Sequence, residues 1–199
     1  MRFMKKTLVL LFMLMMIVGA CEAATAETIN NGAALSKIQR LAIAYPDYFQ
    51  TLETEPSINE FINVLHNAAK VSKVTIISYD DMATKIKQNT GIDIKVLPKK
   101  DARKIFKDNA QLYTDAYVTF TLANNSRLNM FCEVYIPGTN ELIYVLRVEA
   151  GKRDDTKNAA TYKEMAEEFY RAFDNAIRAE AKKIESEKKK SKDKDKKKS

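Results

Sequence analysis

Apolar residues recur every three or four positions in two stretches near the beginning of the chain and in one long stretch near its end. This spacing places them on one face of an amphipathic helix. It predicts a helix over 34–45, a second helix from Ser57, where Ser57 and Glu60 form a capping-box pattern, and a long helix from about Ala159. Residues 34–70 would thus form a helical amino-terminal part of the domain.

Between these helices, short β-branched runs alternate with helical stretches. VSKVTIIS, residues 71–78, and IDIKVL, residues 92–97, are too short for helices and predict two strands. The stretch between them, 80–89, has a helical pattern, and Gly91 supplies a left-handed cap. The sequence therefore predicts a βαβ unit with parallel strands, followed by a further helix over 100–112.

Three longer runs with alternating apolar residues follow: AYVTFTL, LNMFCEVYI and LIYVLRVEA. The connections NNSR and PGTNE provide turn residues, so we expect three antiparallel strands. Taken together, the pattern predicts one α/β domain over 34–181 whose core is 71–181. Its mixed sheet of about five strands would be packed by helices, with the long C-terminal helix lying over it.

The alternation also assigns residues to the two faces of the predicted sheet. Cys132 falls among the inward residues, and we expect it to be a small buried side chain. The second face stays partly apolar through four outward residues, Phe131, Tyr135, Ile143 and Val145. We expect the segment 35–69 to cover this face; the alternative is that it is a partner surface.

The first residues have the composition of a secretory signal. Three basic residues precede an apolar run, Leu8–Val18, which is too short to span a bilayer. The sequence VGAC resembles a bacterial lipobox, and predicts a signal peptide over 1–20, a lipid anchor at Cys21 and a tether over 21–33. The triplet ATA before Glu27 offers an ordinary cleavage site instead. We expect an exported protein, membrane-anchored and facing the periplasm or the exterior, or alternatively soluble in the periplasm or secreted.

The net charge of +7 is concentrated at the two ends of the chain. Removing the three positive charges of the signal and the net six of residues 182–199 leaves residues 21–181 with a charge of −2. A nucleic-acid-binding domain places its basic residues on the folded surface. The charge distribution therefore excludes nucleic acid as an expected partner.

The Lys-rich tail, 182–199, has no apolar residue after Ile184. We expect it to be disordered or a fraying helix end. It could contact an anionic surface, or it could serve only to keep the protein soluble. The lysines that would make such a contact are Lys188, Lys189, Lys190, Lys192, Lys194, Lys196, Lys197 and Lys198.

Few residues in the chain could carry catalysis. The single histidine, His66, lies in the second predicted helix and cannot form a zinc site alone. No phosphate-binding glycine loop and no GxSxG motif is present, so we expect no catalytic, cofactor or metal site. One pair stays open: Asp80 and Asp81 follow a predicted strand, where α/β proteins often bind ligands. Helix capping by one of them is the alternative to a polar or metal site.

The order of these elements, together with Asp115-Ala116-Tyr117-Val118, resembles the amino-terminal α/β domain of TolB and related domains of CsgG-type and LpoB-type bacterial envelope lipoproteins. The resemblance covers about residues 71–180. It implies an envelope binding or assembly module, and it transfers no catalytic motif. The glycines that family members often place around the first helix are missing here.

We therefore expect a non-catalytic exported envelope protein that is lipid-anchored at Cys21 and binds an envelope protein partner. A soluble periplasmic enzyme or metal-dependent protein using Asp80 and Asp81 is the first alternative. A protein that binds polyanionic surfaces through its Lys-rich tail is the second.

Overall fold

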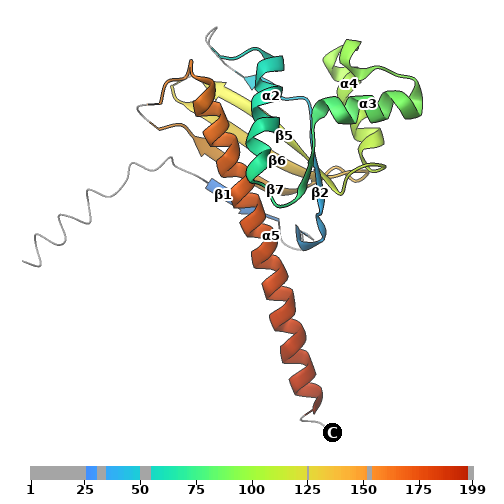
Figure 1. Ribbon diagram of the computed structural model, residues 1–199. Helices are drawn as coiled ribbons and strands as arrows, with labels where there is room; N and C mark the ends of the chain where they lie inside the picture. Colours follow the sequence, from blue (N-terminus) through green and yellow to red (C-terminus); the bar gives the residue numbers. More distant parts are fainter. Residues whose placement is uncertain (1–25, 31–34, 50–54, 125, 152–153, 197–199) are drawn as a thin grey trace, which may run out of the picture.

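The computed structural model describes residues 26–30, 35–49, 55–124, 126–151 and 154–196. They form a mixed α/β arrangement with one seven-stranded sheet and a long C-terminal helix (Figure 1). The strands are β1 (Ala26–Ile29), β2 (Arg40–Ile43), β3 (Asp47–Phe49), β4 (Thr75–Ile77), β5 (Ala116–Asn124), β6 (Leu128–Ile136) and β7 (Glu141–Glu149). The α-helices are α2 (Ile58–Ala68), α3 (Tyr79–Thr90), α4 (Lys99–Ala110) and α5 (Ala159–Lys196), with 3-10 turns η1 (Leu35–Lys37), η2 (Ala69–Val71) and η3 (Ile94–Val96).

The sheet has an antiparallel half and a parallel half. Its strand order is β1-β7-β6-β5-β2-β4, and β3 pairs with β5 beside the end of β2. The meander β5-β6-β7 is antiparallel, as the alternation predicted, and β1 adds a further antiparallel strand to it. Strands β2, β3 and β4 enter parallel to their neighbours. The mixed α/β class is confirmed, although the sheet has seven strands where about five were expected.

Helices α2 and α5 cover one face of the sheet (Figure 1). Helix α2 begins with the capping box that the sequence predicted between Ser57 and Glu60. Fully buried aromatic rings join α5 to the sheet, since Phe120 of β5 packs edge-on against Phe169, with ring centroids 5.2 Å apart. Cys132 is fully buried in this layer, as expected.

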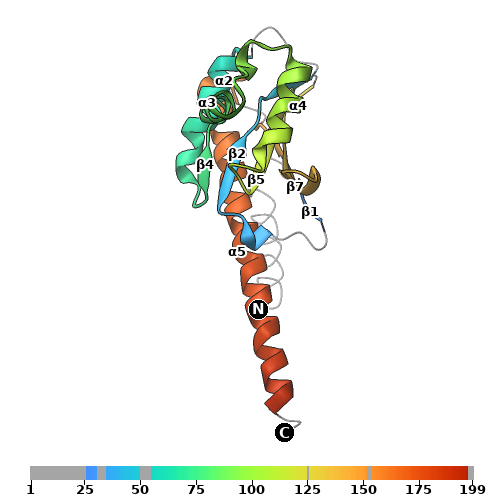
Figure 2. The same cartoon turned by 90° about the vertical axis from the view of Figure 1, so that its right-hand side faces the viewer.

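Helices α3 and α4 lie on the other face of the sheet, at its parallel end (Figure 2). They form a second, smaller core in which Phe106 of α4 lies between Tyr79 of α3 and Tyr117 of β5. Gly91 ends α3 at φ 74°, in the left-handed conformation that glycine adopts without steric cost. The domain thus has three layers, with the sheet in the middle.

The helix predicted over 34–45 is wrong. This segment forms η1 and then β2, which lies inside the sheet between β4 and β5. Leu41 and Ile43 face the α2–α5 layer, whereas Ala42 faces the α3–α4 layer. A strand with both faces covered is apolar throughout and does not alternate, so its pattern was mistaken for a helical face.

The strand predicted over 92–97 is also wrong. This segment forms η3, in which only Ile94 is buried, and the Asp93 side chain accepts a hydrogen bond from the Lys95 N–H at 3.1 Å. The parallel neighbours of the sheet are instead β2 and β4, with α2 lying between them in sequence. The βαβ unit therefore exists, but it begins one element earlier than the pattern indicated.

The structure also corrects the expectation that the segment 35–69 covers the second face of the sheet. Helix α2 packs mainly on the first face with α5, and α3 and α4 occupy part of the second. Ile143 was expected to point outward. A register shift between β6 and β7 after Val134 places it instead in the core on the first face. Phe131 and Val145 remain half-buried on the second face.

Both ends of the described chain are more ordered than the pattern suggested. Residues 26–29, which were expected to belong to a tether, form β1 along the edge of β7. Helix α5 continues to Lys196, through most of the tail that was expected to be disordered or fraying (Figure 1). Lysine and glutamate have high helix propensity, and Glu185 pairs with Lys189 one turn later at 2.8 Å.

Asp115 holds the start of β2 against the start of β5. Its carboxylate accepts hydrogen bonds from the backbone N–H groups of Gln39 and Arg40 at 3.0 and 2.9 Å and from Arg40 Nη2 at 3.0 Å. Burial acts to raise the pKa of Asp115, but these hydrogen bonds outweigh it and the pKa lies below its ordinary value. The residue that opens the DAYV signature is therefore a structural clamp.

We expect Asp115→Asn to lower the stability of the domain by about 1 to 2 kcal/mol, because it removes the charge from these hydrogen bonds. The stabilisation is present above the unfolded-state pKa of about 3.9 and is lost as the pH falls through the lower folded-state pKa. Urea unfolding between pH 7 and pH 3 would measure both effects. Asp108→Asn, at an exposed position of α4, is the matched control. Equal stability of the two variants at pH 7 would contradict the clamp.

Candidate functional site

Asp80 and Asp81 lie in the first turn of α3, directly after β4. The N-cap of this helix is Ser78, which accepts a hydrogen bond from the Asp81 N–H at 3.0 Å. This corrects the expectation that one of the aspartates is the cap. The Asp81 carboxylate in turn accepts a hydrogen bond from Ser78 Oγ at 2.7 Å. Asp81 therefore supports the start of the helix, and its charge complements the helix dipole.

Asp80 points to a different neighbour, since its carboxylate forms an ion pair with Lys95. The pair borders a shallow polar hollow of about 380 Å³. Its other lining residues are Tyr45, Asn59, Ile62, Asn63 and Tyr79. In the described residues no three His, Cys, Asp or Glu side chains gather as a metal site would require.

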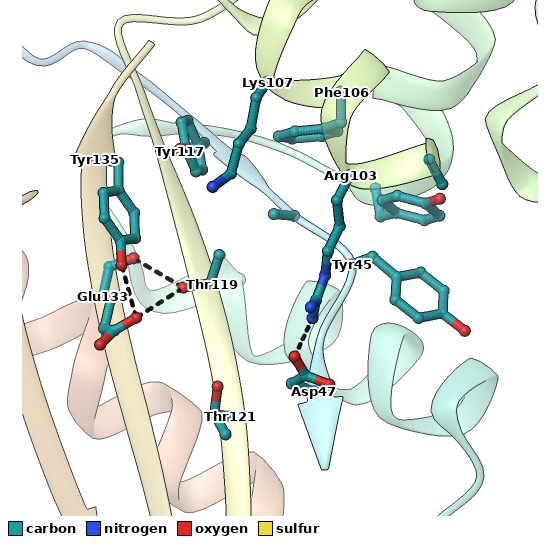
Figure 3. Close-up of a pocket in the computed structure, with 13 residues that line it drawn as sticks. Tyr45, Asp47, Arg103, Phe106, Lys107, Tyr117, Thr119, Thr121, Glu133 and Tyr135 are labelled. Atoms are coloured by element: carbon teal, nitrogen blue, oxygen red, sulfur yellow. Dashed lines mark hydrogen bonds and ion pairs between the residues drawn. The ribbon is translucent and has the colours of Figure 1, made fainter. Parts of the chain in front are cut away.

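A second hollow lies between α4 and the second face of the sheet (Figure 3). We call it the α4 cleft; its volume is about 200 Å³. One wall carries Arg103, Phe106 and Lys107 of α4, and the floor carries side chains of β5 and β6. The remaining lining residues are Ala44, Tyr45, Asp47, Tyr79, Ala102, Tyr117, Thr119, Thr121, Glu133 and Tyr135. The α4 cleft is the part of the second sheet face that lies beside α4 and that the helix leaves uncovered.

Asp47 of β3 closes one end of the α4 cleft. Its carboxylate pairs with both Lys99 and Arg103 of α4. Burial acts to raise the pKa of Asp47, but the hydrogen bonds from Lys99 and Arg103 outweigh it and lower the pKa. Asp47 therefore stays charged at neutral pH, and it ties α4 to the parallel end of the sheet.

The floor of the α4 cleft is a set of hydroxyl groups around Glu133. Tyr135 donates to the Glu133 carboxylate at 2.8 Å, and Thr119 Oγ1 lies 3.5 Å from the same oxygen. Tyr135 stacks on Tyr117 with ring centroids 5.3 Å apart, and Lys107 Nζ lies 5.8 Å from the Tyr135 ring centre (Figure 3). Burial raises the pKa of Tyr117 to about 12, and burial together with Glu133 raises that of Tyr135 further.

Resolved pKa shifts are present at four of the residues that line the α4 cleft. General acid–base catalysis works best with groups whose pKa lies near the working pH. Where the shift of a cleft residue is resolved, it moves away from neutrality: Asp47 becomes a stronger acid, and Tyr79, Tyr117 and Tyr135 become weaker acids. The arrangement offers hydroxyl groups, fixed charges and aromatic edges, which suit the binding of a ligand.

The remaining sequence-predicted residues that the structure describes do not line the α4 cleft. Cys21, Lys197 and Lys198 fall outside the described residues. Lys188, Lys189 and Lys190 are exposed on the projecting end of α5, and the backbone of Lys192, Lys194 and Lys196 continues that helix. His66 is exposed on α2. No described helix is both long enough and apolar enough to cross a membrane.

Sequence reasoning missed the residues that line the α4 cleft. The basic residues of α4 stand together in the sequence KKDARKIFK. They drew no attention because residues 21–181 as a whole have a negative net charge. Thr119, Thr121 and Glu133 were visible as outward positions of their strands. Their convergence with α4 depends on β2 entering the sheet beside β5, which the pattern did not indicate.

No family model matches this chain, and no curated protein matches it. Among solved structures, it is similar to the C-terminal domain of LpoB from Escherichia coli, at 14% identity and a TM-score of 0.46, over 62% of this chain and 88% of that one. It is also similar to the PelC dodecamer from Paraburkholderia phytofirmans, at 8% identity and a TM-score of 0.40, over 73% and 94% of the two chains. A hypothetical protein from Chlamydia trachomatis matches at 10% identity and a TM-score of 0.42, over 70% and 98%.

The LpoB-type domain, to which the sequence was found to be similar, is thus also among the structural neighbours. At these identities and TM-scores, the likeness concerns the course of the chain. The function proposed below rests on this protein's own residues.

Because Asp81 supports the start of α3, we expect Asp81→Ala to lower stability by about 0.5 to 2 kcal/mol. Asp80→Ala removes only an exposed ion pair and is expected to cost less than about 1 kcal/mol. Thermal melts in the presence and absence of Mg²⁺ and Ca²⁺ would measure both. A melting temperature that rises with either ion in the parent, and no longer does so in the variants, would contradict the purely structural role of Asp81 and favour a metal site.

We further expect the protein to lose stability above about pH 10, the ordinary pKa of tyrosine. The raised pKa values mean that the folded state favours the protonated phenols, and this contribution disappears as the pH rises through the folded-state values. Ultraviolet absorbance titration would show phenols that ionise only on unfolding. Tyr135→Phe should remove one of these late phenols; an unchanged late fraction would contradict the assignment.

Proposed function

We propose that this chain is an exported, lipid-anchored envelope protein that acts as a non-catalytic binding or assembly module, and that the α4 cleft is where it holds its partner. The observation that carries the binding role is the arrangement of the α4 cleft, in which hydroxyl groups on the sheet floor face basic side chains of α4. Asp47 is committed to Lys99 and Arg103, and the tyrosines have pKa values moved away from neutrality. Such a site presents fixed charges and hydroxyl groups to a ligand.

The start of the chain supports the envelope location. A basic start, a short apolar run and VGAC ending at Cys21 together favour export followed by lipid attachment. Strand β1 begins at Ala26, so only four residues separate Cys21 from the sheet. An extended residue spans at most about 3.6 Å. A lipid on Cys21 would therefore hold the domain close to the membrane surface.

The first alternative, a metal-dependent enzyme, has less support from the geometry. Asp80 is paired with Lys95, and Asp81 is hydrogen-bonded to Ser78. A cation would have to displace a lysine from Asp80 and a hydroxyl from Asp81. The carboxylates of Asp80 and Asp81 thus have separate structural partners.

We expect the mature protein from a bacterial host to begin at Cys21, with a mass increased by attached acyl chains, and to fractionate with membranes. Cys21→Ser should remove both the added mass and the membrane association. Cys132→Ala is the matched control, because Cys132 is the other cysteine of the chain and is fully buried. Intact-mass spectrometry of the membrane and soluble fractions makes the measurement.

A mass that begins at Glu27, found in the soluble fraction for both variants, would overturn the lipid-anchored part of the proposal. The binding role of the α4 cleft would then belong to a soluble periplasmic or secreted protein.

A further inference from the structure

Helix α4 carries five basic side chains that border one open, shallow hollow on the surface. They are Lys99, Lys100, Arg103, Lys104 and Lys107, and we call them the α4 basic row. Their spacing of one, four, five and eight positions from Lys99 places them on one face of the helix. The two acidic residues of the helix, Asp101 and Asp108, do not line this hollow. The row therefore forms a continuous positive stripe.

Carboxylates of the protein offset part of this stripe. Asp47 pairs with two members of the row, Lys99 and Arg103. Within the part of the chain that the structure describes, Lys100 and Lys104 have no ion-pair partner. Both are exposed. A stripe of this kind attracts an anionic ligand by charge complementarity.

The α4 basic row opens directly into the α4 cleft. Arg103 and Lys107 line both hollows, and in Figure 3 their side chains extend from α4 toward the sheet. Beyond them the floor presents the hydroxyl groups of Thr119 and Thr121 and the Glu133–Tyr135 pair. A ligand that follows the row would thus meet acceptors and donors that suit hydroxyl groups.

We propose that the α4 basic row and the α4 cleft together bind an acidic polysaccharide, with its carboxylates on the lysines and its sugar hydroxyls in the cleft. This inference rests on the proposed binding role of the cleft and specifies its ligand. The charge selects an anion, and the hydroxyl-lined recess beside the row selects a polyhydroxylated one. A flat lipid surface can meet the exposed row but does not enter the recess.

The site is distinct from the Lys-rich tail. The lysines of the tail lie on the end of α5, which projects away from the domain, whereas α4 lies on the opposite side of the sheet from α5 (Figures 1 and 2). The exposed tail residues Lys188, Lys189 and Lys190 line neither the α4 cleft nor the hollow along the α4 basic row. The two regions can therefore be tested separately in the same full-length mature chain.

The test is calorimetric titration of the mature chain with oligogalacturonate, a uronic-acid oligomer, at low and moderate salt. We expect binding that weakens with salt. Lys100→Gln/Lys104→Gln should weaken it about tenfold, as the loss of two exposed charge contacts predicts. Lys188→Gln/Lys189→Gln, the matched control on α5, should bind like the parent. Glutamine keeps the helix propensity of lysine, and thermal melts confirm that both variants are folded.

The recess is tested by Thr121→Val, which removes one hydroxyl and keeps the shape and charge of the cleft. It should weaken oligogalacturonate binding and leave any weak binding of poly-L-glutamate unchanged. The parent should also bind oligogalacturonate more tightly than poly-L-glutamate, because only the sugar has hydroxyls for the recess.

Four results would overturn the inference. Equal affinity for poly-L-glutamate, insensitive to Thr121→Val, would indicate an acidic protein partner. Binding to phosphatidylglycerol vesicles that depends on Lys100 and Lys104, without oligogalacturonate binding, would indicate a membrane surface. Equal losses of affinity in the α4 and α5 variants would show that the ligand binds by non-specific charge attraction. If none of the probes binds, an acidic polysaccharide is not the ligand of the row. None of these results changes the Cys21 fractionation, which tests the proposed envelope location independently.

Discussion

The parallel pairing of β2 with β5 is the constraint on which the rest of the structure depends, and hydrogen bonds from the backbone of Gln39 and Arg40 to the Asp115 carboxylate hold its beginning. They align β2 with the beginning of β5, and β2 is the strand through which β4 joins the sheet. The antiparallel meander forms from neighbouring segments and needs little help, whereas a parallel strand must be brought in from far along the chain at an entropic cost. Charge-assisted hydrogen bonds at the strand start offset part of that cost.

The location of the candidate site follows from this arrangement. Once β4 pairs with β2, the chain continues into α3 and α4 on the second face of the sheet, so that Phe106 reaches Tyr79 and Tyr117. The helix pair covers the parallel end of that face. Its edge leaves a groove over β5 and β6, which the outward side chains of the strands line with hydroxyls, and α4 turns its basic row toward the same opening. Position and charge of the site are thus two consequences of one packing arrangement.

Much of the fold was accessible from the sequence because its signals are local. The capping box at Ser57, the left-handed Gly91 and the alternation of the three long strands each depend on contacts within a few residues, and the structure contains all three. The predictions for the segments 34–45 and 92–97 were wrong for opposite reasons. The first is buried on both faces and lost its alternation, and the second has the composition of a strand but only one buried residue, Ile94.

The sequence by itself determined the α/β class, the meander and the long C-terminal helix, since periodicity and short motifs carry that information. Only the tertiary structure decided which strand enters the middle of the sheet, which helices cover each face and which polar residues meet. Basic residues of α4, Asp47 of β3 and Glu133 of β6 are far apart in the chain, and no local pattern records their proximity. Their meeting is set by the packing of helices on a sheet whose strand order is non-local, which is why the candidate site became visible only in the folded protein.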